Sequence, residues 1–180
     1  SPPEGTHVID VTAMTHRRDP LYYATWMGFT PRESSVFSGM PFTVASHLAV
    51  ARSNPDIVRV YRPAEAKWHM AVISVDKKLA GDGKQAALSY LGQAGFGTMV
   101  KIVIVVDRDV NPSSWPEVLD ALATHWQPVP GSTLLPLMKG WELDHTTRIH
   151  GMTSKIIIDA TRQFPDEGGP LRADPTGADV

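Results

Sequence analysis

The sequence predicts a layered α/β domain. Short apolar runs of strand length alternate with segments in which apolar residues recur at helical spacing. The run 101–106 (KIVIVV) is β-branched without alternation, which is typical of a central strand buried on both faces. A chain of 180 residues is long enough to bury the core of one ordinary domain.

Strands dominate the expected structure of the first half. Residues 7–15 (HVIDVTAMT) are β-branched and roughly alternating, so they predict a strand, and residues 21–28 form a second extended run rich in aromatic side chains. No helix separates these two runs, so they are free to complete a different sheet. Residues 57–61 and 68–75 alternate like two further strands.

One helix is expected between these two pairs of strands. Residues 31–39 predict a loop, and Pro41 then suits the first turn of a helix. Val44, Leu48 and Ala51 form one apolar stripe at helical spacing, and Asn54-Pro55 ends it.

Two helices and two strands are expected in the second half. Residues 84–93 predict a helix, and the strand 101–106 follows. Ser114, with Glu117 three residues later, predicts a capping box at the start of the second helix. Its apolar stripe consists of Trp115, Val118, Leu119, Leu122 and Trp126, and Pro128 and Pro130 end it. Residues 129–151 predict a long functional loop, and 155–159 a last buried strand.

Composition excludes several classes of protein. The formal net charge of −2 implies no broad basic surface for nucleic acid or an anionic membrane. The sequence has no cysteine, which excludes disulfides, cysteine-ligated zinc and thiol nucleophiles. No apolar run approaches the roughly 20 residues that a bilayer-spanning helix needs.

Asp107 and Asp109 follow the expected central strand, where ligands bind in open α/β sheets. Paired carboxylates at this position suit a divalent cation. The alternative is that Asp109, Asn111 and Ser113 make turn and cap hydrogen bonds into the next helix, which is the more common outcome.

Other polar motifs have a structural interpretation beside the functional one. Asp144-His145 suits an acid/base pair or, more simply, a loop salt bridge. The motif 16–19 (HRRD) suits an anion site or an ion pair. The seven histidines are scattered without metal-ligand spacing. The glycine-rich run 92–97 precedes a strand, which is the wrong context for a dinucleotide fingerprint.

Several segments, in order, resemble the UbiD-type decarboxylases. They are 11–25 (VTAMTHRRDPLYYAT), 71–78 (AVISVDKK), 102–110 (IVIVVDRDV), the helix containing Trp115 and residues 121–124, and the closing 143–144, 154–155 and 158–161 (LD, SK and IDAT). Each motif alone is weak evidence. The collinear set covers residues 8–165 and is specific.

The resemblance implies a flavin-binding split β-barrel joined to a C-terminal α/β domain. Such enzymes use prenylated FMN with Mn²⁺ and K⁺, and they reversibly remove CO₂ from aromatic or α,β-unsaturated acids, with the modified flavin as electron sink. The family's cofactor ligands and catalytic acid lie in polypeptide that would precede this segment. We therefore expect no catalytic residue and no metal ligand here, and no flavin bound by this segment alone.

Site residues carried over from the family are of secondary importance. Met14 matches a residue that lines the substrate pocket, and residues 134–138 (LLPLM) resemble a lid whose leucine closes over the substrate. Leu134 is the best match, with Leu135 beside it. Gln93 lies near a family lysine that contacts the flavin phosphate. Ordinary packing is the alternative for all four.

The resemblance divides the chain into four parts: 1–38 as the end of the split barrel, 39–55 as a linker helix, 56–165 as an oligomerisation and lid domain, and 166–180 as a flexible tail. It implies a cytoplasmic homo-oligomer whose partners are the N-terminal half of the same enzyme and a small carboxylic acid. His125 replaces a family arginine and Arg108 an acidic residue, which puts a standard subunit contact in doubt.

Two other hypotheses stay open. A non-catalytic interaction module would use an interface core built from Trp115, Trp126, Trp141 and Phe164, unless these side chains pack internally. An independent metal-dependent enzyme would use Asp107, Asp109 and loop histidines.

Overall fold

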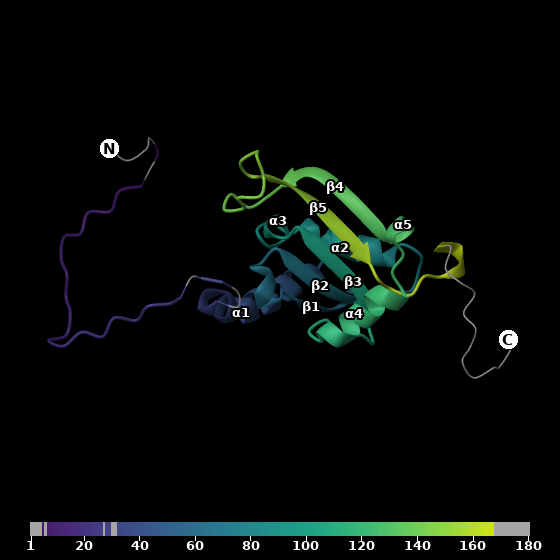
Figure 1. Cartoon of the computed structure of the whole chain (residues 1–180), viewed down its shortest axis with the longest axis horizontal. Helices are drawn as coiled ribbons and strands as arrows, with labels where there is room; N and C mark the ends of the chain where they lie inside the picture. Colours follow the sequence, from purple (N-terminus) through teal and green to yellow (C-terminus); the bar gives the residue numbers. More distant parts are fainter. Residues whose placement is uncertain (1–4, 6, 27, 30–31, 168–180) are drawn as a thin grey trace.

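A five-stranded mixed sheet lies at the centre of the computed structural model, which describes residues 5, 7–26, 28–29 and 32–167. The strand order is β1-β2-β3-β5-β4 (Figure 1). β2, β3 and β5 are parallel, and each edge strand is antiparallel to its neighbour. The strands are β1 (Ile57–Tyr61), β2 (Met70–Val75), β3 (Ile102–Asp107), β4 (Ser132–Lys139) and β5 (Met152–Asp159).

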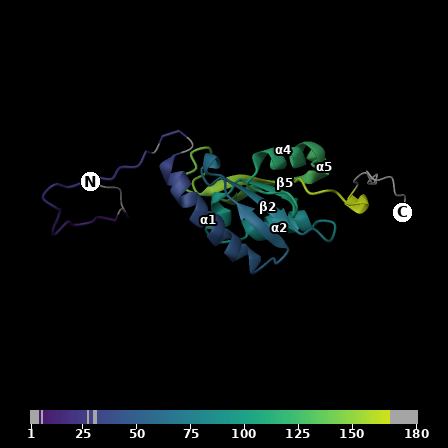
Figure 2. The same cartoon turned by 90° about the horizontal axis from the view of Figure 1, so that it is seen from below.

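Helices cover both faces of the sheet, which gives three layers. Figure 2 shows α1 (Glu33–Ala51) and α2 (Asp82–Leu91) on one side and α4 (Trp115–Thr124) on the other. Four single-turn elements complete the domain: η1 (Ala64–Ala66), α3 (Phe96–Met99), α5 (Pro128–Gly131) and η2 (Pro165–Glu167). Among the helices of the described ranges, none is both long and apolar enough to cross a membrane.

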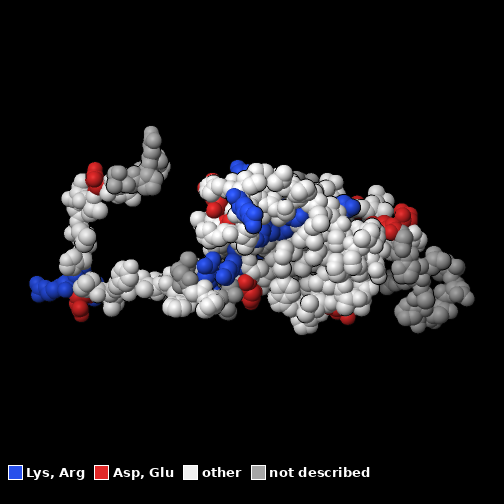
Figure 3. All heavy atoms as spheres, turned by 45° about the horizontal axis from the view of Figure 1, so that its top comes forward, with Lys and Arg blue, Asp and Glu red and all other residues white. Residues whose placement is uncertain are grey.

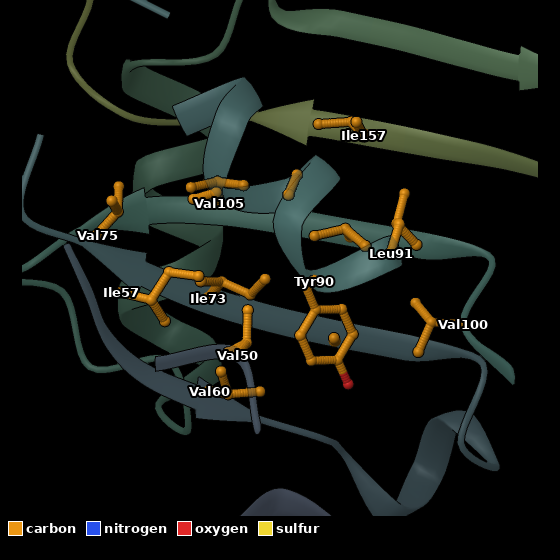
Figure 4. Close-up of a cluster of buried hydrophobic side chains, with 14 residues drawn as sticks. Val50, Ile57, Val60, Ile73, Val75, Tyr90, Leu91, Val100, Val105 and Ile157 are labelled. Atoms are coloured by element: carbon orange, nitrogen blue, oxygen red, sulfur yellow. The ribbon is translucent and has the colours of Figure 1, made fainter. Parts of the chain in front are cut away.

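The central position expected for residues 101–106 is confirmed. Val103 and Val105 of β3 pack into one core cluster together with α2, which includes Tyr90 (Figure 4). Ile104 and Val106 pack into a second cluster against α4. Because successive strand residues face opposite sides, a strand between two helical layers is apolar at every position.

Three of the expected elements are wrong. Residues 7–26 are extended but form no strand, because no other strand of the described chain lies beside them. The loop expected over 31–39 is helical from Glu33, so that Pro41 lies inside α1. The long loop expected over 129–151 contains edge strand β4, which pairs with β5.

The expected capping box is also wrong in detail. Ser114 makes no side-chain cap hydrogen bond. The carboxylate of Glu117 instead accepts a 2.8 Å hydrogen bond from the backbone N–H of Asn111. The turn before α4 is held as expected, because Asn111 Oδ1 accepts hydrogen bonds from the N–H and the hydroxyl of Ser113 at 3.2 and 2.9 Å.

The four aromatic residues considered for an interface pack within the domain. Trp115 and Trp126 lie against the second core cluster. Trp141 contacts Trp68 edge to face, at a centroid distance of 5.3 Å. The ring of Phe164 lies 4.8 Å from the Lys77 ammonium. The internal alternative therefore holds for this set.

Candidate functional site

Leu134 and Leu135 are neighbours on edge strand β4, so they face opposite sides of the sheet. Leu135 packs against the first core cluster. Leu134 is 72% exposed although its strand partner is the core-sheet residue Ile156. Between Leu135 and Met138 the register shifts and Leu137 adopts a positive φ of 53°. Of the predicted pair, Leu134 is therefore the exposed residue and Leu135 the packed one.

An open hollow of about 560 Å³ lies beside Leu134. Apolar side chains from three neighbouring strands, Ile102, Leu134 and Ile156, contribute to its lining. The remaining lining is cationic or hydroxylic: Lys101, Thr146, Thr147, Arg148, Thr153, Ser154 and Lys155. Figure 3 shows Lys and Arg side chains gathered at the end of the domain from which the N-terminal segment leaves. This combination suits a small molecule with an apolar body and an anionic group.

A buried ion pair fixes the β4–β5 connection over this hollow. The Lys101 ammonium lies 3.0 Å from Asp144 Oδ2, and the Asp144 side chain is 3% exposed. Asp144 Oδ1 accepts hydrogen bonds from the N–H and hydroxyl of Thr146 at 3.1 and 2.7 Å. Burial alone would raise the pKa of Asp144, but the Thr146 and Lys101 hydrogen bonds outweigh it and hold the pKa well below its usual value. The salt-bridge interpretation of Asp144 is therefore confirmed.

Replacing Asp144 by Asn tests this ion pair. We expect D144N to lower the free energy of unfolding by about 2 kcal/mol at pH 7, because the charge of Lys101 loses its partner. The folded-state pKa lies below the unfolded value, so the stabilisation is complete above about pH 5 and is lost as the pH falls. Urea denaturation at pH 7 and pH 3 should therefore show a smaller difference in unfolding free energy between wild type and D144N at pH 3. D120N, at an exposed position of α4, is the matched control.

Aromatic contacts hold the same connection at its other end. The Trp141 ring lies 5.8 Å from the His69 ring, and His69 Nδ1 lies 3.0 Å from the carbonyl oxygen of Met99. Burial lowers the pKa of His69, so its neutral form is favoured. His145 is exposed and does not join Asp144 in an acid/base pair.

The structure does not bring Met14 or Gln93 to Leu134. Met14 is 81% exposed, and Figure 1 shows residues 7–26 extending away from the domain. The Gln93 amide donates to Ser53 Oγ and to the carbonyl oxygen of Ser89, at 3.2 and 3.3 Å. Their roles in a pocket or at a flavin phosphate stay predictions.

Asp107 and Asp109 are held by an arginine that the sequence reasoning missed. The guanidinium of Arg162 makes a bidentate pair with Asp109 at 3.0 and 2.9 Å. The backbone N–H of Arg162 donates a hydrogen bond to Asp107 Oδ2 at 2.9 Å. The Arg162 hydrogen bonds lower the pKa of Asp109. His125 Nδ1 lies 3.9 Å from Asp107 Oδ2. Within the described ranges, no three His, Asp or Glu side chains converge as metal ligands would. These carboxylates therefore have structural partners.

Comparison with known proteins identifies the domain. The sequence profile of the 3-octaprenyl-4-hydroxybenzoate carboxy-lyase C-terminal domain (UbiD_C) matches residues 39–160. The chain belongs to the UbiD family. The recognition made from the ordered motifs is thus confirmed, and so is the α/β class of the domain.

The relatives and solved structures that this chain resembles are longer than the chain itself. An uncharacterized protein of Archaeoglobus fulgidus is 34% identical over 170 residues, which cover 93% of this chain and 35% of that protein. Vanillic acid decarboxylase of Sedimentibacter hydroxybenzoicus, in its open form, is 28% identical with a TM-score of 0.80, covering 89% of this chain and 34% of that one. The UbiD-class enzyme HmfF of Pelotomaculum thermopropionicum, in complex with FMN, is 28% identical with a TM-score of 0.66, covering 80% and 32%. The chain spans about one third of each relative's length.

Proposed function

We propose that this chain is the C-terminal portion of a reversible, non-oxidative decarboxylase acting on an aromatic or α,β-unsaturated carboxylic acid through prenylated FMN. In this role it supplies the lid and subunit contacts. The observation that supports the proposal is the position of Leu134: the residue that best matches the family's lid leucine is exposed on strand β4, beside a hollow lined by apolar and cationic side chains.

The residues described here do not complete a site for prenylated FMN, Mn²⁺ or K⁺. The amide of Gln93 is engaged by Ser53 and Ser89, and the carboxylates of Asp107 and Asp109 are engaged by Arg162. We therefore assign the ligands of all three, and the catalytic acid, to the N-terminal half of the enzyme.

The proposed work of Leu134 is exclusion of water. Loss of CO₂ leaves a carbanion-like centre, for which the flavin supplies the electron sink when it is bound. An apolar lid excludes solvent and offers no proton to quench that centre early. Leucine suits this role because its side chain does not titrate.

The proposed partner is the N-terminal half of the same enzyme, joined through residues 7–26. Their apolar side chains are exposed, with Val8, Ile9 and Val11 each more than 70% accessible. An extended, β-branched segment without a strand partner is suited to pairing with a sheet elsewhere. This supports the assignment of 1–38 to the end of a split barrel.

A chimera tests the lid. The matching C-terminal portion of the Sedimentibacter decarboxylase would be replaced by this chain, and flavin uptake measured first. We expect the flavin-loaded chimera to decarboxylate vanillate, and L134A to lower kcat/KM about tenfold, which is ~1.4 kcal/mol of transition-state stabilisation. L119A, at an exposed position of α4, should leave the rate unchanged.

Two results would count against the proposal. A folded, flavin-loaded chimera without turnover would favour a non-catalytic interaction module. Equal rates for L134A and L119A would remove the lid role from Leu134.

A further inference from the structure

Trp68 lies where three parts of the domain meet. Its indole N–H donates a 3.0 Å hydrogen bond to Ser38 Oγ of α1. Its ring packs edge to face against Phe42 of α1 and against Trp141 of the β4–β5 connection, at centroid distances of 6.1 and 5.3 Å. Its carbonyl oxygen accepts a 2.6 Å hydrogen bond from the guanidinium of Arg62, which follows β1. One residue thus contacts α1, the end of β1 and the β4–β5 connection.

The backbone at Trp68 is strained. Lys67 has a φ of 49° and a ψ of 40°, and Trp68 has a φ of 72°. Left-handed backbone is disfavoured for any residue with a Cβ atom, and it is a clear outlier for a bulky one. Arg62, which holds the Trp68 carbonyl, is 2% exposed, so its charge has lost hydration. Such conformations persist only where surrounding contacts fix them, and they cluster at functional sites.

The N-terminal end of α1 contacts one side of this arrangement. The Arg32 guanidinium lies 5.3 Å from the centroid of the Trp68 ring, within cation–π range. Arg32 Nε also donates a 3.1 Å hydrogen bond to Ser35 Oγ. One residue after Arg32, the Glu33 carboxylate accepts a 3.1 Å hydrogen bond from the backbone N–H of Trp26, in the extended N-terminal segment. The segment that we propose pairs with the upstream half therefore joins the domain next to the cation that stacks on Trp68.

The rim of the hollow is held on the other side of the same ring. Trp141 belongs to the β4–β5 connection, residues 140–151, and its carbonyl oxygen accepts the N–H of Asp144 at 2.9 Å. Asp144 in turn holds Lys101 and Thr146, which line the hollow. Figures 1 and 2 show this connection and the N-terminal end of α1 at the same end of the domain. A shift of the Trp141 ring therefore moves the carboxylate that orders the rim.

We propose that Trp68 is a positioning residue for the lid site. Its ring transmits the placement of the N-terminal end of α1, and so of the upstream half of the enzyme, to the connection that orders the hollow beside Leu134. Packing alone explains the ring contacts but not the left-handed backbone, which tryptophan in a relaxed loop does not adopt. The inference rests on the proposed function, because it names a residue that sets the geometry of that same site.

Hydrogen exchange in the 180-residue chain tests the coupling without flavin or turnover. Arg32→Ala removes the cation from the ring and should speed exchange at the hydrogen-bonded amides of Gly140 and Asp144 at least about threefold. In a W68L background the same substitution should change these rates by less than about 1.5-fold, because no aromatic ring remains to transmit it. R52A, at an exposed position beyond the other end of α1, is the matched control and should leave the rates unchanged.

A second Trp68 variant keeps the test independent of how well W68L folds. W68F retains an aromatic ring but loses the N–H that Ser38 accepts, so the response of the connection to R32A should lie between those of wild type and W68L. K67G is added to both Trp68 variants and to their reference, since glycine adopts a φ of 49° without strain and forms no new side-chain contact. Urea denaturation shows that each variant is folded before exchange is measured.

Kinetics of the flavin-loaded chimera distinguish positioning from a general loss of structure. We expect W68F to lower kcat per bound flavin about fivefold and to leave KM and flavin content within about twofold of wild type, because the hollow still forms but its rim is misplaced. A purely structural role would lower flavin content and leave kcat per bound flavin unchanged, which would overturn the proposal.

The exchange experiment has its own contrary result. Equal responses to R32A in the wild-type and W68L backgrounds would mean that Trp68 transmits nothing from α1 to the connection. This outcome overturns the coupling whether or not the chimera turns over vanillate. A chimera without turnover, combined with the expected exchange rates, would instead count against the decarboxylase assignment and leave the coupling established.

Discussion

Lys155→Met should lower the free energy of unfolding by about 3 kcal/mol, because three backbone carbonyls, two of them buried, lose their donor. Lys155 lies on β5 and is 2% exposed. Its ammonium donates to the carbonyl oxygens of Gly97, Thr98 and Val100, at 2.8, 3.0 and 2.5 Å. Methionine matches the length of the side chain but donates nothing. The midpoint of urea denaturation at pH 7 measures the effect.

The pH dependence of the stability difference distinguishes the effect of the Lys155 charge from an effect of side-chain packing alone. Burial lowers the pKa of Lys155 from 10.5 to about 8. The desolvation cost of the charge is therefore present below pH 8 and relieved as the pH rises towards 10.5, because the folded state releases its proton first. We expect the stability advantage of wild type over K155M to be smallest below pH 8 and to increase as the pH rises between these two values.

K139M is the control, since Lys139 is exposed on the neighbouring edge strand. It should change the unfolding free energy by less than about 0.5 kcal/mol. A loss below about 1 kcal/mol for K155M would mean that water replaces the ammonium at the three carbonyls.

Elements whose sequence pattern reflects burial on both faces could be predicted. Residues 101–106 lack alternation because α2 and α4 bury opposite sides of β3, and the structure places this strand at the centre of the sheet. Edge strand β4 could not be identified in this way. It contains Pro136, its register shifts after Leu135, and Leu134 and Leu137 are exposed, so no period of two appears.

The wrong expectations for the N-terminal part of the chain have a different cause. Residues 7–15 have the β-branched pattern of a strand, but a strand forms only against a partner, and none lies beside them in the described chain. Pro41 suits a helix start, whereas α1 begins eight residues earlier at Glu33. The apolar residues of this helix have the right spacing, but spacing alone does not reveal that they face outward.

The site was predictable only in part. Leu134 and Leu135 came from family motifs, and the structure shows which of the two is exposed. The partners of the charged residues are distant in sequence: Lys101 and Asp144 are 43 residues apart, and Arg162 and Asp109 are 53 apart. No local pattern signals such pairs, because they depend on how the chain folds back.

Gly97→Ala should destabilise the domain by about 3 kcal/mol or more, through a steric clash. A Cβ atom at this position would lie 2.3 Å from the Leu91 carbonyl oxygen and 2.7 Å from that of Tyr90. Both residues belong to the end of α2, and their side chains are in the first core cluster, so this backbone cannot move aside cheaply. The loss would appear as a lower urea midpoint and a lower Tm.

Two other glycines of the run 92–97 provide graded controls. A Cβ at Gly92 meets its nearest atom at 3.4 Å, and φ there is −73°, so G92A should change stability by less than about 0.5 kcal/mol. Gly95 has open space but a φ of +81°, so G95A should cost about 1 kcal/mol. Any other ranking of the three would contradict the steric explanation.

The large stability losses expected for K155M and G97A both arise at the same turn, α3. Gly97 packs against the end of α2, while its carbonyl oxygen accepts a hydrogen bond from Lys155 on β5. α3 is thus fixed between a helix and a strand, next to Gln93. If one substitution already loosens the packing of this turn, the second substitution removes less of the unfolding free energy. We therefore expect the double variant K155M/G97A to lose less than the sum of the single losses, by at least about 1 kcal/mol in a double-mutant cycle. Additive losses of unfolding free energy would mean that the two contacts stabilise independent structures. α3 would then not couple β5 to α2.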